Sequence, residues 1–201
     1  MANSPVGRGT NIKGTVCKCN NIYKYSESGL HHECGVLGIY GVPDAANLAY
    51  YGLHALQHRG QQGCGIVSVD SEGEFHRFRG DGLVTEVFNE DKISKLQGNM
   101  AIGHVRYSNA KCKGTENIQP FLFHHNSGDF AMANNGQIAN YVQLRLELED
   151  KGSLFQSASD AEVIAHLIKK QGTDKSLPRI HAIKDALNHL DGAFAFVIMT
   201  G

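Results

Sequence analysis

The sequence lacks a strong excess of either charge and any long apolar run. Its 201 residues hold 19 lysines and arginines against 20 aspartates and glutamates, so the formal net charge is −1. This balance gives no electrostatic basis for binding nucleic acid or an anionic membrane surface. No apolar stretch approaches the roughly 20 residues that cross a bilayer, so we expect no membrane-spanning segment. With 41% apolar residues and only 4 prolines, the chain suits one globular domain.

Cysteine is sparse, and its spacing does not form a disulfide framework. The five cysteines are an odd number, which favours a reducing compartment, so we expect a cytoplasmic protein. Cys17 and Cys19 could bind a metal, but no second cysteine or histidine pair stands at zinc-site spacing, so we predict no metal site. The eleven histidines are scattered and are expected to be surface or hydrogen-bonded core residues.

Residues 1–33 differ in composition from the rest of the chain. They lack the apolar core of a secretory signal, and the stretch 1–15 is polar and irregular. We therefore predict a flexible leader over 1–33, which cleavage could remove, followed by one domain over 34–201. Because the chain stops one residue after an apolar, core-like strand, we expect it to be part of a longer polypeptide.

Apolar periodicity after Glu33 predicts runs of strands with helices between the runs. We expect strands over 34–40, 65–69, 74–79, 100–107, 129–133 and 193–200, and helices over 141–149, 160–170 and 183–190. Consecutive strands of this kind indicate an α+β fold, in which helices cover sheets, rather than a strict βαβ alternation. The last strand is apolar at nearly every position and should be covered on both faces.

One more helix is expected before residue 60. Its apolar face would be formed by five residues at helical spacing, and Gly60 would stop it. These residues are Leu48, Tyr51, Gly52, Ala55 and Leu56.

Cys34 opens a short run of apolar residues and glycines that reads Glu33-Cys34-Gly35-Val36-Leu37-Gly38-Ile39-Tyr40-Gly41. The run is typical of a buried strand with the thiol at its leading end. If the chain is cut before Cys34, one residue carries both a thiol nucleophile and an α-amine that can act as its base. The alternative is that Cys34 is a small hydrophobic residue of the core.

Four other segments place polar residues beside a glycine or at the end of an element. They are Leu56-Gln57-His58-Arg59-Gly60-Gln61-Gln62-Gly63, Ile102-Gly103-His104-Val105-Arg106-Tyr107-Ser108, Asn134-Asn135-Gly136-Gln137-Ile138 and Ser159-Asp160-Ala161-Glu162. Each has a structural alternative. Arg59 could interact with the end of its helix, and Arg106 could be a strand-end surface charge. Asn135-Gly136 is a strong signal for a hairpin turn, and Asp160 could only favour a helix start within a capping box.

Taken together with Cys34, these segments resemble the glutamine-hydrolysing domain of the class II, N-terminal-nucleophile glutamine amidotransferases. Within that class, Glu-Cys-Gly-Val-x-Gly-Ile, Leu-Gln-His-Arg-Gly-Gln and Gly-His-Val-Arg-Tyr-Ser are most similar to the amidophosphoribosyltransferase family. The sugar-phosphate amidotransferases carry Tyr-Arg-Gly at the second segment and fit less well. The resemblance runs from about Glu33 to the C-terminus, and it implies a four-layer αββα sandwich of the N-terminal-nucleophile hydrolase type.

The resemblance also implies a role for each site residue. Cys34 would attack the side-chain amide of glutamine, and the Asn135 side chain and Gly136 N–H would stabilise the oxyanion. Arg106 would bind the α-carboxylate of glutamine and Asp160 its α-ammonium group. Arg59 would have a supporting role near the nucleophile. Three features depart from the family: residues 109–113 differ in the loop expected to close over glutamine, Asn134 replaces the usual histidine, and 33 residues precede Cys34.

In this family, ammonia passes to a phosphoribosyltransferase domain that aminates phosphoribosyl pyrophosphate, the first step of purine nucleotide synthesis. That domain is absent from this chain. The resemblance implies Mg²⁺ in the missing domain, no cofactor in this one, and a homo-oligomer. Two alternatives stay open: another class II amidotransferase, and a non-catalytic glutamine-binding domain that retains the leader.

Overall fold

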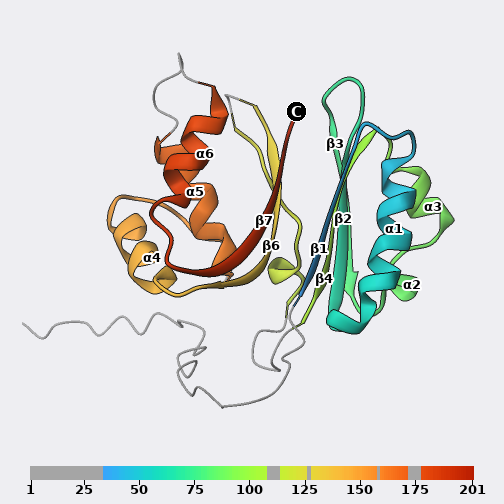
Figure 1. The fold of residues 1–201 in the computed structure, drawn as a ribbon, viewed down its shortest axis with the longest axis horizontal. Coiled ribbons are helices and arrows are strands. Elements are labelled where there is room, and N and C mark those ends of the chain that lie inside the picture. The colour runs from blue at the N-terminus through green and yellow to red at the C-terminus, as the bar shows by residue number, and fades with distance from the viewer. Residues whose placement is uncertain (1–33, 108–113, 126–127, 158, 172–177) are drawn as a thin grey trace, which may run out of the picture.

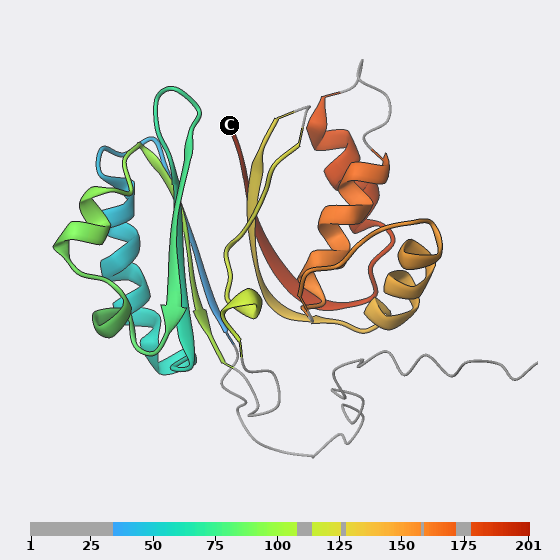
Figure 2. The same ribbon diagram turned by 180° about the vertical axis from the view of Figure 1, so that it is seen from behind.

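The computed structural model describes residues 34–107, 114–125, 128–157, 159–171 and 178–201. The expected leader, with Cys17 and Cys19, and the loop 109–113 lie outside the described residues. Two β-sheets lie face to face, and helices cover the outer face of each sheet (Figures 1 and 2). The described chain therefore has the four layers, helix, sheet, sheet and helix, that the sequence led us to expect.

The first sheet contains four antiparallel strands in the order β1-β4-β2-β3. They are β1 (Gly35–Tyr40), β4 (Met100–Arg106), β2 (Gly63–Val69) and β3 (Phe75–Asp81). Both β1 and β2 pair with β4, which is therefore an inner strand. Between β2 and β3 the Asp70 carboxylate accepts hydrogen bonds from the N–H groups of Glu72 and Glu74, at 2.9 and 3.0 Å. These bonds, with that of the Gly73 N–H to the Asp70 carbonyl at 3.2 Å, close a turn between the two strands.

The second sheet contains three antiparallel strands in the order β5-β6-β7. They are β5 (Phe121–Phe123), β6 (Phe130–Ile138) and β7 (Gly192–Thr200). The strand β7 is covered on both faces, as expected: Phe194 and Phe196 pack toward the helices, and Val197 and Met199 pack toward the first sheet. Because β7 is an edge strand, only Met199 is buried; the other eight residues of β7 are divided equally between half-buried and exposed.

Six α-helices are described, three on each outer face (Figure 1). The first sheet is covered by α1 (Ala45–Leu56), α2 (Val84–Val87) and α3 (Glu90–Ser94). The second sheet is covered by α4 (Tyr141–Asp150), α5 (Ala161–Gln171) and α6 (Arg179–Leu187). Two short 3₁₀ turns span Gln57–Arg59 and Thr115–Asn117.

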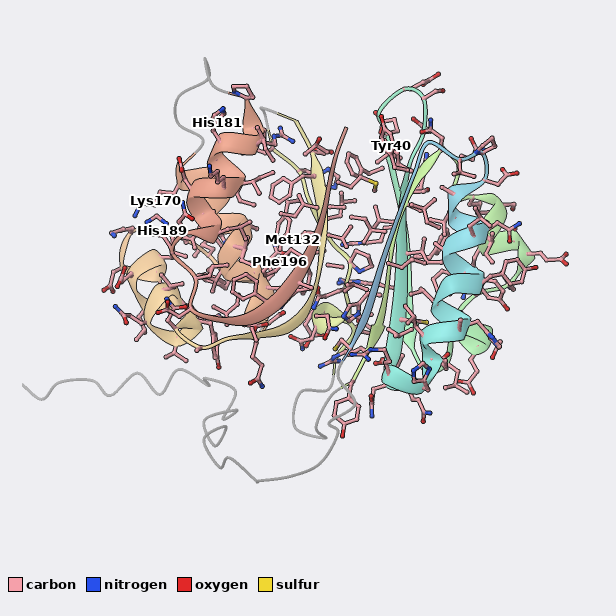
Figure 3. All side chains as sticks on the ribbon, viewed as in Figure 1. Tyr40, Met132, Lys170, His181, His189 and Phe196 are labelled. Atoms are coloured by element: carbon pink, nitrogen blue, oxygen red, sulfur yellow. The ribbon has the colours of Figure 1, made fainter. Side chains whose placement is uncertain are left out.

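The hydrophobic core is divided among three interfaces. Val67, Ile102 and Met199 pack between the two sheets. Met132 and Phe196 belong to the cluster between the second sheet and its helices, where Figure 3 shows their side chains. Because alternate residues of a strand face opposite sides, the parity of a residue decides which interface it enters.

The buried face of α1 differs from the expected one. The helix exists, but its buried residues are Ala45, Ala46, Ala49 and Leu53, whereas Leu48 and Tyr51 are 47% and 64% exposed. Small alanine side chains let a helix axis lie close to a sheet, which the larger apolar residues would prevent. The apolar face expected from helical spacing is therefore wrong at Leu48 and Tyr51.

The strand β6 is longer than the expected 129–133 and continues through Asn134, Asn135 and Gly136 to Ile138. In the register with β7, Asn135 pairs with Ala195 and Gly136 with Phe194. The hairpin turn considered for Asn135-Gly136 is therefore wrong.

Candidate active site

Cys34 lies immediately before β1, at the end of the first sheet where β4 finishes. The backbone N–H of Tyr107 donates to the Cys34 sulfur at 3.3 Å, and the thiol donates weakly to the Tyr107 carbonyl at 3.6 Å. Gly35 pairs with Val105 in the β1–β4 ladder, so the next step of the same register brings Cys34 beside Arg106. The thiol is therefore at the leading end of the strand, as the sequence predicts.

Burial is the main influence on the Cys34 thiol, and it raises the pKa. The Tyr107 backbone hydrogen bond and the positive charge of Arg106 lower this pKa, and the negative charge of Asp160 raises it. A thiol with a raised pKa is protonated at neutral pH, so it needs a base before it can act as a nucleophile. The charges of Arg106 and Asp160 act on the thiol, so both residues lie in its electrostatic neighbourhood.

Arg106 is the last residue of β4 and is only 8% exposed. The alternative of a strand-end surface charge is therefore wrong. Gly60 lies against its main chain: a Cβ at residue 60 would come within 2.5 Å of the Arg106 carbonyl carbon. Gly60 does follow the end of the α1 region, but its φ of −159° is extended, so close approach to β4, not a left-handed cap, is the property that requires a glycine here.

Arg59 contacts the main chain of Cys34 directly. It ends the 3₁₀ turn that follows α1, and its Nε donates to the backbone carbonyl of Cys34 at 3.3 Å. This bond fixes the main chain of Cys34 rather than its sulfur. The contact agrees with the supporting role expected for Arg59, and it shows that the side chain reaches away from its own helix end.

Asn135 and Gly136 occupy adjacent positions in β6. Gly136 has a φ of +123°, and a Cβ there would collide with the Ala193 carbonyl oxygen and approach the Phe194 Cα to 2.7 Å. Only glycine fits this conformation so close to β7. The Oδ1 of Asn135 is buried and has no hydrogen-bond partner among the described residues.

Asp160 stands directly before α5. Its carboxylate accepts a hydrogen bond of 3.0 Å from the Ile138 N–H at the end of β6. Burial raises the pKa of Asp160, and backbone hydrogen bonds, first that of Ile138, lower it. The side chain therefore links the helix to the strand of Asn135 and does more than favour a helix start.

Glu162 is a buried carboxylate near Asp160, and its spacing from Ser159 predicts only a role in a capping box. It is 4% exposed, and it accepts hydrogen bonds from the Gln156 N–H, the Ser157 N–H and the Ser157 hydroxyl, at 2.8, 2.7 and 2.6 Å. Burial raises its pKa, but the His166 ring, 3.9 Å from the carboxylate, and the hydrogen bonds from Ser157 and Gln156 outweigh this and hold it at about 2. The carboxylate thus fixes the chain that leads to Asp160.

His104 lies two residues before Arg106 on β4 and is completely buried. Burial lowers its pKa to about 3; the Asn134 backbone raises this pKa and the positive charge of Arg106 lowers it further. Neither ring nitrogen has a well-formed hydrogen bond among the described residues. A histidine that stays neutral down to about pH 3 is a poor base near pH 7.

Two observations bear on other kinds of site. Among the described residues, no group of three or more histidine, cysteine, aspartate and glutamate side chains could hold a metal ion, and no helix is long and apolar enough to cross a membrane. A hollow of about 670 Å³ lies along α4, but none of the expected site residues lines it. We therefore place the candidate site at Cys34, whose thiol is influenced by the charges of Arg106 and Asp160.

Two facing sheets lie between layers of helices, and a cysteine stands directly before the edge strand β1. These features are those of the class of N-terminal-nucleophile hydrolases. Comparison with known proteins gives the family. The family described as "Glutamine amidotransferase domain" matches residues 104–201. An amidophosphoribosyltransferase of Lacticaseibacillus casei is 48% identical over 177 residues, which are 88% of this chain and 89% of the relative. The chain therefore belongs to the amidophosphoribosyltransferase family.

Longer relatives and solved structures agree with this assignment. The amidophosphoribosyltransferase of Bacillus subtilis (strain 168) is 51% identical over 173 residues, or 86% of this chain and 36% of the relative. The solved structure of the glutamine phosphoribosylpyrophosphate amidotransferase from B. subtilis, complexed with ADP and GMP, matches with a TM-score of 0.75 and 49% identity. It covers 82% of this chain and 35% of that one. The chain thus spans about a third of the length of these two proteins.

Proposed function

We propose that this domain hydrolyses glutamine to glutamate and ammonia, with Cys34 as the nucleophile once the chain begins at that residue. The observation that carries the proposal is the position of the thiol: the Tyr107 N–H holds the sulfur at 3.3 Å, where β4 ends in the buried Arg106. A thiol with a raised pKa needs a base, and a free α-amine, whose reference pKa is about 7.7–8.0, is a suitable one.

The first half of the reaction forms a thioester. The Cys34 sulfur attacks the amide carbon of glutamine, its proton passes to the α-amine, and the carbonyl electron pair moves to the oxygen. The Asn135 amide and the Gly136 N–H are the proposed donors to this oxyanion, and one such donor is worth roughly 3–4 kcal/mol. When the oxyanion collapses, the carbon–nitrogen bond breaks and the α-ammonium returns the proton to the leaving nitrogen, which departs as ammonia.

The second half regenerates the thiol. Water attacks the thioester carbon, the α-amine takes a proton from that water, and the sulfur leaves with a proton as glutamate is released. Arg106 holds the substrate α-carboxylate and Asp160 its α-ammonium, so that the charged end of glutamine is bound while its side-chain amide meets the thiol. Arg59, through the Cys34 carbonyl, keeps the nucleophile residue in place. No step within this domain requires a metal or other cofactor.

The activity of the whole protein is a further part of the proposal. The two proteins named above from Bacillus subtilis are amidotransferases of this family, and about two-thirds of their length lies beyond the matched part. In a longer chain of this kind, ammonia would pass to a phosphoribosyltransferase domain that binds Mg²⁺ and phosphoribosyl pyrophosphate. We place this homo-oligomeric enzyme in the cytoplasm, in purine nucleotide synthesis.

The test is a glutaminase assay on protein whose first residue has been verified. N-terminal sequencing shows whether the chain begins at Cys34, and glutamate release is then measured for that form and for its Cys34→Ala variant. Hydrolysis that requires Cys34 supports the proposal. Glutamine binding without hydrolysis, by a form that begins at Cys34, would instead identify a non-catalytic glutamine-binding domain.

A further inference from the structure

The strand β6 extends beyond its partner β5 on one edge. The three residues of β5 pair with Met132, Ala131 and Phe130, so this ladder ends before Asn134. Beyond the end of this ladder, the side chain of Gln119 makes the hydrogen bonds to Asn134 that a residue of a paired strand would make. The Asn134 N–H donates to the Gln119 Oε1 at 2.6 Å, and the Gln119 Nε2 donates to the Asn134 carbonyl at 3.4 Å. One side-chain amide thus provides both the donor and the acceptor that a neighbouring peptide group would provide.

The segment that carries Gln119 is itself held in place. Gln119 is 7% exposed, and the preceding Ile118 is completely buried. The Ile118 carbonyl accepts a hydrogen bond of 2.7 Å from Arg79 on β3. The amide of Gln119 therefore connects β6 to a segment that is itself bound to β3. Its contact with Asn134 thus fixes the position of the Asn134 main chain.

The hydrogen bond to the Asn134 carbonyl bears directly on Asn135. The Asn134 carbonyl and the Asn135 nitrogen belong to one planar peptide group, so a bond that fixes the carbonyl also fixes the main chain from which the Asn135 side chain projects. The Asn135 Oδ1 has no partner among the described residues. The main chain around Asn135 is therefore held by the β7 ladder on one side and by Gln119, through the Asn134 carbonyl, on the other.

We infer that Gln119 is a positioning residue for the oxyanion site: its amide holds the Asn134–Asn135 peptide group, so that the donors of Asn135 and Gly136 are aligned with the developing oxyanion. This inference rests on the proposed function. Because the oxyanion exists in the transition state and not in bound glutamine, misalignment lowers kcat and leaves the binding of planar ligands nearly unchanged.

The first experiment compares Gln119→Met with the matched control Gln143→Met in protein that begins at Cys34. Methionine keeps the length of the side chain but provides neither hydrogen bond. Gln143 is exposed on α4, where it donates to Glu147 at 3.0 Å. We expect kcat to fall about 10- to 100-fold in Gln119→Met, with KM changed less than about threefold, and the control to retain wild-type kinetics.

Two inhibitors separate a positioning role from a general structural one. The aldehyde analogue of glutamine adds the Cys34 thiol to give a tetrahedral adduct, in which the aldehyde oxygen occupies the oxyanion position. Glutamate binds without this adduct. Gln119→Met should weaken inhibition by the aldehyde by about the same factor as kcat and leave inhibition by glutamate unchanged. Equal losses for both inhibitors, or wild-type kcat, would overturn the inference.

Gln119→Glu provides an independent test. The carboxylate can accept from the Asn134 N–H but cannot donate to its carbonyl, whereas the protonated acid can do both. Burial should raise the pKa of this new group, so the ratio of variant kcat to wild-type kcat should rise as the pH is lowered. A ratio that does not vary with pH would contradict the inference.

The outcomes also separate this inference from the proposed function. If wild-type protein beginning at Cys34 hydrolyses glutamine and both Gln119 variants match it, only the inference fails. If the wild-type form does not hydrolyse glutamine, the proposed function fails. If Gln119→Met does not fold, the pH dependence of Gln119→Glu decides, and failure of both variants to fold would assign Gln119 a purely structural role.

Discussion

The carboxylate of Asp160 and the backbone N–H of Ile138 are joined by a 3.0 Å hydrogen bond. This bond connects the start of α5 to the end of the strand that carries Asn135 and Gly136. A group proposed to bind substrate and a pair proposed to stabilise the oxyanion are therefore held in one rigid unit. Burial raises the pKa of Asp160, and the ammonium group of glutamine would provide a cation beside this carboxylate.

The proposed substrate contacts can be tested by conservative substitutions. Arg106→Lys keeps the charge but loses the planar pair of donors that fits a carboxylate. Glutamine should bind more weakly by roughly 1.5–3 kcal/mol, the scale of a hydrogen bond to a charged group. Asp160→Asn should act similarly through the ammonium group. The measurement is KM for glutamine, and unchanged values in both variants would show that neither residue contacts the substrate.

The assignment of Cys34 as nucleophile predicts selective chemistry among the cysteines. Cys34→Ser and Cys34→Ala should abolish glutaminase activity, and a glutamine-mimicking electrophile should label Cys34 alone. Cys64 is completely buried, and burial raises its pKa to about 12, so its thiol should be unreactive. Cys64→Ala and Cys112→Ala serve as controls that should retain activity. Mass spectrometry of the labelled protein identifies the modified residue, and label on Cys64 or Cys112 would argue against the assignment.

His104 predicts a component of acid sensitivity in the stability of the fold. Its pKa in the folded state is about 3, mainly because of burial, whereas an unfolded chain protonates histidine near 6.5. The unfolded state therefore binds more protons between these values. The stability that comes from the neutral ring is fully present above about pH 6.5 and is lost as the pH falls toward about 3.

Urea unfolding of wild type and His104→Gln at several pH values measures this component. The glutamine side chain does not titrate, so the free energy of unfolding of the variant should fall less steeply on acidification. The difference between the two slopes should approach about 1.4 kcal/mol per pH unit between pH 6 and 4. His181→Gln is the control, because His181 is exposed on α6 (Figure 3). Parallel curves for wild type and His104→Gln would mean that His104 protonates in the folded state.

Glu162 should affect activity through Asp160. The Glu162 carboxylate accepts three hydrogen bonds from Gln156 and Ser157. Glu162→Gln keeps one of its acceptor oxygens but removes its negative charge. We expect a several-fold increase in KM for glutamine in this variant, and a much smaller further increase when it is combined with Asp160→Asn. Kinetics of the single and double variants give the coupling. Additive effects would show that Glu162 acts on stability alone.

The sequence predicts the strands and the site better than it predicts how they pack. Cys34 could be placed at a strand end because the apolar run after it has the length of a buried strand and glycines at its boundaries. The resemblance of the segments that contain Arg106 and Asp160 implied that both lie near Cys34, and their charges do act on its thiol, while their roles toward substrate stay predictions. These features depend on short stretches of chain, whose residue types carry local information.

The features that the sequence did not predict depend on contacts between distant segments. The pairing of Gln119 with Asn134 joins residues 15 positions apart, and nothing in the residues around Gln119 distinguishes it from other buried amides. Gly136 has the residue type of a turn, but β7 passes beside it and continues the strand. The face of α1 that is buried was set by how closely the helix approaches the sheet. In each case tertiary packing overrode a local preference.

The last prediction concerns residues 1–33, which lie outside the described residues. While they are attached, the nitrogen of Cys34 is part of an amide, and an amide nitrogen has no basic lone pair that could take the thiol proton near pH 7. Burial has already raised the pKa of that thiol, and His104, with a pKa of about 3, cannot replace the missing base. We therefore expect the 201-residue form to be a precursor with little or no glutaminase activity.

A form that begins at Cys34 should gain activity by orders of magnitude, and its rate should depend on a group that titrates near the α-amine reference of about 7.7–8.0. Both forms are purified, their first residues are verified by mass spectrometry, and glutamate release is measured across pH. The Cys34→Ala variant of the shortened form is the control for contaminating glutaminase. Equal rates from the two verified forms would exclude the α-amine as the base, because the uncut form does not have one, and a different residue near Cys34 would then have to accept the proton.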